Sequence, residues 1–182
     1  LFEVLAGPWM GKNRRRGVPY FWAVRHLADG RGLASPRSFL VGIRDAAEKS
    51  LDAEGSDYPL HYESLKKGIQ KASKIRVDEM AEDYPWVKEL CGLLDGLNVP
   101  SEFSRFEDRW KSRYPDGPST IKSNRLPPQS ASEGWTGIKQ ELVRLGVFEE
   151  TQDSRINMPD LYRVGFGLGR MGGVAPLKRS RS

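Results

Sequence analysis

A basic segment near the start of the chain carries the most concentrated charged chemistry in the sequence. It contains Lys12 and three consecutive arginines, Arg14, Arg15 and Arg16. Guanidinium and ammonium groups bind phosphates and carboxylates, so such a block can hold a phosphate, a nucleic acid or an acidic protein partner. A solvated basic loop is the simpler interpretation of any single run of this kind. We therefore treat these four residues as a candidate site for a phosphate or an acidic partner, with the solvated loop as the alternative.

Two glycine patterns imitate nucleotide-binding motifs. Residues 7–13, GPWMGKN, resemble a P-loop, but the glycines are one residue too close together and Asn13 stands where the magnesium-binding Ser or Thr belongs. Residues 167–172, GLGRMG, match the dinucleotide-binding pattern, but that pattern needs a strand before it and a helix after it within a βαβ unit. Neither context is predicted here, so we expect no nucleotide-binding motif and no cofactor within this chain.

The residue types that most often carry catalysis are sparse. The sequence has two histidines, His26 and His61, and one cysteine, Cys91. Neither histidine has a Cys, Ser or carboxylate at a spacing that indicates a catalytic triad, and the set is too small for a zinc site. Cys91 lies on the apolar face of a predicted helix, where buried packing is the usual role. We therefore predict that the chain is not an enzyme and binds no metal.

The apolar residues recur mainly at the 3.6-residue spacing of helices. This spacing, together with Gly and Pro at its boundaries, predicts helices over about 1–6, 20–27, 36–51, 61–84, 86–94, 101–114 and 132–145, and a last turn over 160–164. Residues 147–151 and 155–158 flank a polar turn and predict a β-hairpin. The sequence therefore predicts a mainly α fold with one β-hairpin.

The order of these elements suggests two subdomains. A helical subdomain covers residues 1–84, and a winged-helix-like subdomain covers 85–164. The second contains a Pro- and Ser-rich stretch, 115–132, that we predict to be a mobile loop, and a Gly-rich basic tail follows over 165–182. Three helices and then a hairpin give the order of a winged helix-turn-helix, in which 132–145 takes the place of the recognition helix. A helical bundle with an additional hairpin gives the same order.

The predicted recognition helix and hairpin carry three candidate residues for binding duplex DNA, namely Lys139, Arg144 and Arg155. Phosphate contacts from basic side chains supply most of the affinity of non-specific DNA binding. Acidic residues such as Glu149 and Glu150 lie close by in the sequence and reduce the positive charge that a DNA-binding surface needs. A winged helix that contacts protein is therefore at least as well supported by the sequence as one that binds DNA.

Composition limits the class of protein further. The 182 residues include 29 Lys and Arg against 24 Asp and Glu, a net charge of +5. The excess lies at the two ends, because residues 1–50 hold nine basic and four acidic side chains, residues 51–100 six and ten, and residues 151–182 six and two. A single cysteine excludes a disulfide scaffold and fits a reducing compartment. Since no apolar run reaches the roughly 20 residues of a membrane helix, we predict a cytoplasmic protein without a membrane partner.

Several stretches resemble the C-terminal region of large bacterial P-loop ATPases, of the ParA/MinD-like kind with long C-terminal extensions. These stretches are LAGPWMG at 5–11, RRRG at 14–17, HLADG at 26–30, SPRSFL at 35–40, NMPDLYR at 157–163 and GRMGGV at 169–174. The resemblance covers most of the chain but includes no catalytic motif.

This resemblance implies a function as a non-catalytic accessory or regulatory region of such an ATPase. The ATPase core of the same or a neighbouring chain would then be the partner of Lys12 and Arg14–Arg16. The chain begins with Leu1 rather than Met, so we interpret it as a fragment. The resemblance implies that a nucleotide-binding domain, holding ATP and magnesium, precedes Leu1. The alternative function is a winged-helix module that binds duplex DNA.

Overall fold

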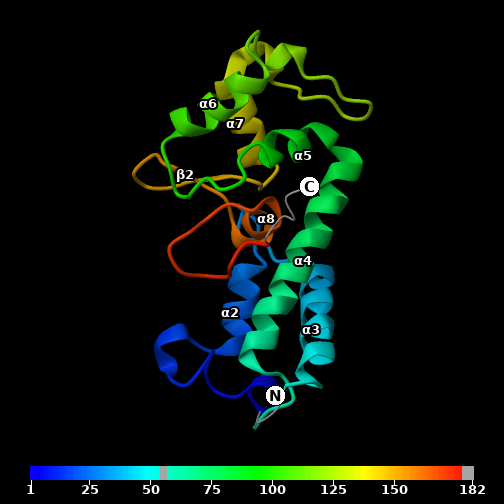
Figure 1. Cartoon of the computed structure of the whole chain (residues 1–182), viewed down its shortest axis with the longest axis vertical. Coiled ribbons are helices and arrows are strands. Elements are labelled where there is room, and N and C mark those ends of the chain that lie inside the picture. The colour runs from blue at the N-terminus through cyan, green and yellow to red at the C-terminus, as the bar shows by residue number, and fades with distance from the viewer. Residues whose placement is uncertain (54–56, 178–182) are drawn as a thin grey trace.

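Helices dominate the computed structural model of the chain, which describes residues 1–53 and 57–177 (Figure 1). The α-helices are α1 (Phe2–Ala6), α2 (Pro19–His26), α3 (Pro36–Ser50), α4 (Tyr62–Asp83), α5 (Pro85–Gly92), α6 (Phe103–Arg113), α7 (Gly134–Arg144) and α8 (Asp160–Phe166). Short 3-10 helices are η1 (Arg14–Arg16), η2 (Pro118–Thr120) and η3 (Ala131–Glu133), and the strands β1 (Glu149–Glu150) and β2 (Ile156–Asn157) pair as an antiparallel hairpin. The predicted fold, mainly α with one β-hairpin, is confirmed.

Helix α4 connects the two ends of the molecule (Figure 1). Its 22 residues span about 33 Å at the usual rise per residue. It packs against α3, α5 and α8, and its apolar side chains, such as Leu65, Ile69 and Met80, are buried in these contacts. Within the residues that the structure describes, no helix is both long and apolar enough to cross a membrane.

The main hydrophobic core extends across position 84, where the sequence predicts a division. It includes Leu27 from the first part and Phe148 from the second. The turn after α2 adds a backbone contact between the parts, because the Gly30 N–H donates to the carbonyl oxygen of Gly146 at 2.7 Å. Residues of the two predicted subdomains therefore contribute to one core, and the division at position 84 stays a prediction.

Aromatic rings fill the core of the second part. The ring of Trp110 stacks on that of Phe148, with 6.2 Å between centroids, and lies 5.4 Å from that of Trp135. Ser101, between α5 and α6, and Ile156 of β2 each donate a backbone N–H to the carbonyl oxygen of the other, at 2.9 and 2.8 Å. This bridge places a third extended segment beside the hairpin.

The segment 115–132 is anchored to the rest of the chain at several points. Ile121 is buried. The carboxylate of Glu141 on α7 accepts hydrogen bonds from the N–H groups of Gln129 and Ser130, at 3.1 and 3.0 Å. The end of the segment is therefore fixed to α7, and the mobility of the remainder stays a prediction.

The glycine-rich tail is docked on the second part of the chain. Its apolar side chains, such as Leu168, are buried. The Gly169 N–H donates to the carbonyl oxygen of Leu97 at 2.9 Å, and the Gly169 carbonyl oxygen accepts from the N–H of Val99 at 3.0 Å. Residues 178–182, which hold three basic side chains of the predicted tail, lie outside the described residues.

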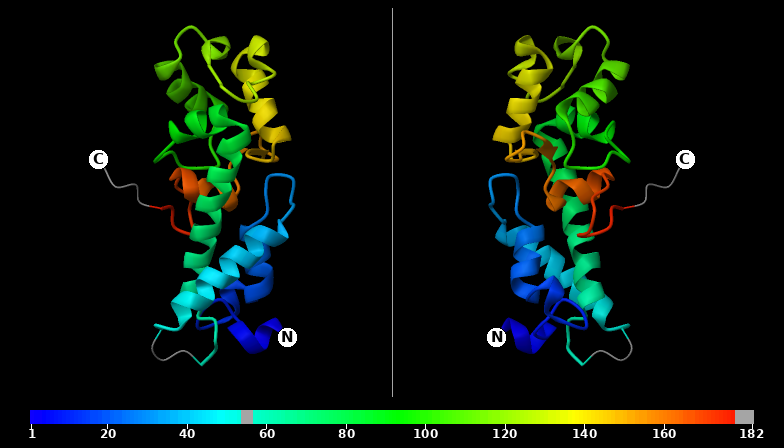
Figure 2. Two further views of the ribbon diagram at one scale, coloured as in Figure 1. Left: turned by 90° about the vertical axis from the view of Figure 1, so that its right-hand side faces the viewer. Right: turned by 90° about the vertical axis from the view of Figure 1, so that its left-hand side faces the viewer.

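Helices α3 and α4 pack against each other (Figure 2). Gly42 of α3 and Gly68 of α4 lie at their contact. A β-carbon at Gly68 would overlap the carbonyl oxygen of Gly42. A β-carbon at Gly42 would lie 3.4 Å from the carbonyl oxygen of Gly68, which is ordinary van der Waals contact. The close approach of the helices therefore depends on Gly68 much more than on Gly42.

We expect Gly68→Ala to lower the free energy of unfolding by about 1–3 kcal/mol, because the added methyl group forces the two helices apart. Gly42→Ala is the matched control. It should leave the free energy of unfolding unchanged or raise it by up to about 1 kcal/mol, since Ala is favoured over Gly inside helices. Urea denaturation followed by circular dichroism measures both effects. Equal destabilisation by the two substitutions would contradict this account of the helix crossing.

Candidate functional site

The basic segment forms a closed loop at the N-terminal end of the molecule, which we call the basic loop (residues 10–17). Met10 is fully buried, and its N–H donates to the carbonyl oxygen of Gly17 at 2.9 Å. The side chain of Asn13 accepts a hydrogen bond from the N–H of Arg15 at 3.1 Å, where η1 begins. These hydrogen bonds close the loop and fix its backbone. The cations of the loop therefore extend from a fixed backbone.

The structure brings the four predicted cations of this loop together. Lys12, Arg14, Arg15 and Arg16 are all exposed. Among residues 1–53 and 57–177, none of the ion pairs involves any of these four. Positive charge that is not compensated locally attracts anions over about 10 Å at 0.1 M salt. The basic loop is therefore suited to bind a phosphate or an acidic protein surface.

Four aromatic rings in contact with one another form a partly exposed apolar surface, which we call the aromatic patch (Phe2, Tyr20, Phe21 and Phe39). The patch adjoins the basic loop through Phe2, which packs against the small core that holds Met10. The Tyr20 ring is its centre, 5.6 Å from the ring of Phe2, 5.5 Å from that of Phe21 and 5.9 Å from that of Phe39. Two of its residues are exposed to solvent, Phe21 by 68% and Tyr20 by 43%. Apolar side chains gathered in this way are typical of protein-binding surfaces.

The three predicted DNA-binding residues are all engaged inside the chain. Lys139 Nζ pairs with Glu150 at 3.2 Å and lies over the ring of Phe103. Arg144 donates to the hydroxyl oxygen of Ser130 at 2.8 Å, and Arg155 pairs with Asp153 at 2.7 Å. Lys139 of α7 therefore contacts the hairpin through Glu150. Carboxylates compensate the charges of both Lys139 and Arg155, which leaves less positive charge for binding phosphate.

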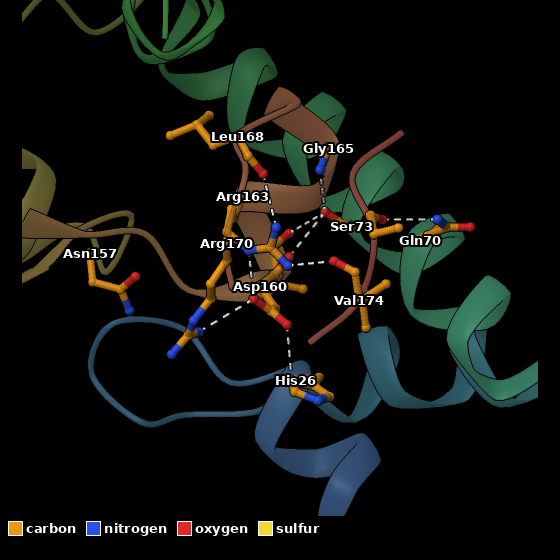
Figure 3. Close-up of polar contacts among 12 residues, drawn as sticks. His26, Gln70, Ser73, Asn157, Asp160, Arg163, Gly165, Leu168, Arg170 and Val174 are labelled. Carbon is orange, nitrogen blue, oxygen red and sulfur yellow. Dashed lines mark hydrogen bonds and ion pairs between the residues drawn. The ribbon is translucent and has the colours of Figure 1, made fainter. Parts of the chain in front are cut away.

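A buried ion pair lies where the tail, α8 and α2 meet (Figure 3). Arg163 is fully buried, and its Nε donates to Asp160 Oδ1 at 2.7 Å. Its other two nitrogens donate to the carbonyl oxygens of Leu168 and Val174, at 2.9 and 2.6 Å. The second carboxylate oxygen of Asp160 lies 3.1 Å from His26 Nδ1. The pair therefore holds the tail on α8 and α8 on α2.

Asp160 keeps its negative charge in this buried place. Burial alone would raise the pKa of Asp160, but the hydrogen bonds from His26 and Arg163 and the charge of Arg163 outweigh burial and hold that pKa well below its usual range. Arg170, half-exposed on the tail, lies 3.5 Å from the same carboxylate and adds a further positive charge. Asp160 is therefore ionised at neutral pH.

A cleft of about 480 Å³ lies beside this ion pair. Its charged lining includes Arg25 and Arg170 on the one hand and Asp29, Glu149 and Asp160 on the other. Because groups of both signs line the cleft, its charge favours neither an anion nor a cation. The cleft therefore indicates no ligand class, in contrast to the basic loop.

The sequence pattern alone does not single out Asp160 and Arg163. Their spacing of three residues is that of an ion pair on one helix turn, which is the only local signal. Charged residues in a short helix near a glycine-rich tail are usually solvated. The contact with His26 joins segments that lie far apart in the sequence, so no local pattern reveals it.

Within the described part of the chain, no group of three or more His, Cys, Asp and Glu side chains is arranged to hold a metal ion. Comparison with protein-family models, with curated proteins and with solved structures finds no match to this chain. Function is therefore inferred from the geometry of the basic loop, the aromatic patch and the buried ion pair.

We expect Asp160→Asn to lower the free energy of unfolding at pH 7 by about 3–5 kcal/mol, because it leaves Arg163 charged, buried and without its carboxylate partner. The pKa of Asp160 is lower in the folded chain than in the unfolded one. The stabilisation should therefore be fully present above about pH 4 and be lost as the pH falls below that value. Urea denaturation between pH 3 and pH 7 measures both effects.

The matched control is Asp153→Asn on the exposed hairpin turn. The hydrogen bond from Arg155 lowers the pKa of Asp153 to about 2, but this carboxylate is fully exposed. We expect this variant to keep the stability of the unaltered chain at pH 7, since exposed ion pairs contribute little. If the two variants lost the same stability, the buried pair would not have the central role assigned to it.

Proposed function

We propose that this chain is a non-catalytic accessory region of a bacterial P-loop ATPase and that it docks on the ATPase core, of the same or a neighbouring chain, through its N-terminal end. The observation that carries the proposal is the aromatic patch beside the basic loop, two exposed surfaces of complementary kind at one end of the molecule. Aromatic and arginine side chains are enriched at protein interfaces and supply most of their binding energy. The choice of a P-loop ATPase as the partner follows from the sequence resemblance.

The docking face is connected to the rest of the molecule through α2. Tyr20 and Phe21 lie in the first turn of this helix, and His26 lies in its last turn, against Asp160. A partner that shifts the start of α2 therefore acts on the buried ion pair that fixes α8 and the tail. This connection is what an accessory region needs if it is to transmit the nucleotide state of an ATPase core.

The basic loop determines which partners suit this face. Four exposed cations repel a basic partner and attract a carboxylate-rich one, and such complementarity governs partner choice and association rate more than affinity. The partner surface is therefore expected to combine an apolar centre, facing Tyr20 and Phe21, with acidic residues facing Arg14–Arg16.

A winged-helix module that binds duplex DNA is the second candidate. The Ser101–Ile156 bridge supports a winged-helix arrangement, since it adds a third extended segment to α5, α6, α7 and the hairpin. The pairing of Lys139 and Arg155 with carboxylates lowers the charge available for phosphate contacts. The order of the elements therefore supports the DNA-binding function, whereas the charge of the predicted binding residues gives it little support.

We expect substitution of Arg14, Arg15 and Arg16 together by Ala to change the steady-state ATP turnover of the ATPase that contains this chain at least fivefold, with the chain still folded. Phe21→Asp should have the same effect, because it places a charge in the apolar centre of the docking face. Turnover is measured by phosphate release, and folding of the 182-residue chain by circular dichroism.

The control for this experiment is a triple Ala variant at Arg109, Lys122 and Arg125, which are three exposed basic residues in the other half of the chain. It removes the same charge and should leave ATP turnover unchanged. If turnover and assembly remain normal in both docking-face variants, the accessory function is wrong. If the control changes turnover equally, the effect is one of net charge and not of docking.

The DNA-binding alternative makes a separate prediction. A DNA-binding winged helix should hold a labelled duplex with an affinity that falls steeply between 50 and 200 mM salt, and Lys139→Ala or Arg144→Ala should weaken that binding. Fluorescence anisotropy measures both quantities. No binding of the duplex at 50 mM salt would exclude this alternative.

A further inference from the structure

Two clefts adjoin the basic loop, and Lys12 lines both of them. The first, of about 450 Å³, is lined by Trp9, Lys12, Tyr58, His61 and Tyr62 together with smaller residues. The second, of about 420 Å³, is lined by Lys12, Arg15, Arg16, Tyr62 and Glu63 among others. Because Gly11, Lys12 and Tyr62 line both, the clefts adjoin each other. We propose that they bind a nucleobase in the first cleft and its adjoining phosphate groups in the second.

Aromatic side chains dominate the wall of the first cleft. Trp9 lines the cleft and is 40% exposed, and the rings of His61 and Tyr62, which also line it, lie 4.4 Å apart. Every nucleobase has a flat π-face, so exposed aromatic rings provide stacking platforms for bases of any sequence. The first cleft therefore offers stacking surfaces for a nucleobase. A simple inorganic anion has no flat ring and would gain nothing from them.

Positive charge dominates the wall of the second cleft. Lys12, Arg15 and Arg16 face it, and guanidinium groups match phosphate oxygens in geometry as well as in charge. Glu63 also lines this cleft, but Lys66 holds its carboxylate at 2.6 Å and compensates its charge. The second cleft is therefore electropositive and suited to phosphate.

Asp57 adds a carboxylate to the first cleft and does not line the second, which holds Arg15 and Arg16. A carboxylate there would repel a phosphate but can accept hydrogen bonds from the amino groups of a base. The distribution of charge thus orients the ligand, with the base beside Trp9 and Asp57 and the phosphates beside Arg15 and Arg16. Each cleft is within the size range of small-molecule sites.

The basic loop, which contributes residues to both clefts, is preformed. Met10 anchors it in the smaller core, and the Met10–Gly17 hydrogen bond closes it. Binding there need not order the backbone of the loop, which reduces the entropy lost on association. This proposal requires no ATPase core, although it uses Lys12, Arg15 and Arg16, which also belong to the docking face proposed above.

A base with adjoining phosphates can come from a free nucleotide or from single-stranded nucleic acid. We would titrate the 182-residue chain with ADP, with a labelled 12-residue single-stranded thymidine oligonucleotide, and with pyrophosphate, which has the phosphates without the base. Calorimetry measures ADP and pyrophosphate, and fluorescence anisotropy measures the oligonucleotide. We expect ADP or the oligonucleotide to bind at least tenfold more tightly than pyrophosphate.

Substitutions then assign the binding to the clefts. Trp9→Ala should weaken binding at least tenfold, whereas Trp9→Phe should retain most of it because a stacking face remains. Ala at Lys12, Arg15 and Arg16 together should also weaken binding at least tenfold and reduce its salt dependence. Lys122→Ala is the control, since it removes an exposed cation that lines neither cleft and should change nothing. Circular dichroism checks that each variant is folded.

The outcomes separate the two ligand sources and the ways in which the proposal fails. Tighter binding of ADP identifies a free nucleotide, and tighter binding of the oligonucleotide identifies single-stranded nucleic acid. Absence of binding by both at 1 mM, equal binding of pyrophosphate, or indifference to Trp9→Ala would each overturn the proposal. Preferential binding of a polyglutamate peptide would overturn it as well and would leave the docking function intact.

Discussion

Arg163 and Asp160 form the contact on which the remaining arrangement of the chain depends. A fully buried guanidinium is costly unless every nitrogen is satisfied, and here the three nitrogens bond to Asp160, Leu168 and Val174. The carboxylate in turn reaches His26 of α2. One charged pair therefore fixes α8, the glycine-rich tail and the N-terminal helices relative to one another, and none of these segments can shift without exposing or stranding a charge.

Helix α4 also holds α8 in place, through hydrogen bonds of one buried side chain. The hydroxyl group of Ser73, fully buried on α4, donates to the carbonyl oxygen of Leu161 at 2.7 Å and accepts from the N–H of Gly165 at 2.8 Å. Side chains from two other helices, Ser73 of α4 and His26 of α2, thus bind α8. These contacts stabilise a helix that, with seven residues, is too short to be stable by itself. Because α3 packs on α4 through Gly42 and Gly68, the N-terminal end is connected to α8 as well.

The elements were predictable from the sequence because their signals are local. Apolar stripes with Pro36, Pro85 and Gly146 at their ends mark helices whose observed bounds differ from the predicted ones by only a few residues. The hairpin was predictable for the same reason. The contacts of Asp160 with His26 and of Gly42 with Gly68 were not, since they depend on how helices pack and not on any pattern within one segment.

The candidate binding residues were only partly predictable from the sequence, for the same reason. The sequence marks Arg14–Arg16 and the group around Lys139 as basic, but charge becomes a binding surface only where carboxylates do not compensate it. The structure places Glu150 on Lys139 and Asp153 on Arg155, while the ion pairs of the described residues leave the basic loop out. The uncompensated cations also adjoin exposed aromatic side chains, and this combination is the reason that the proposals above concern the N-terminal end and not the hairpin.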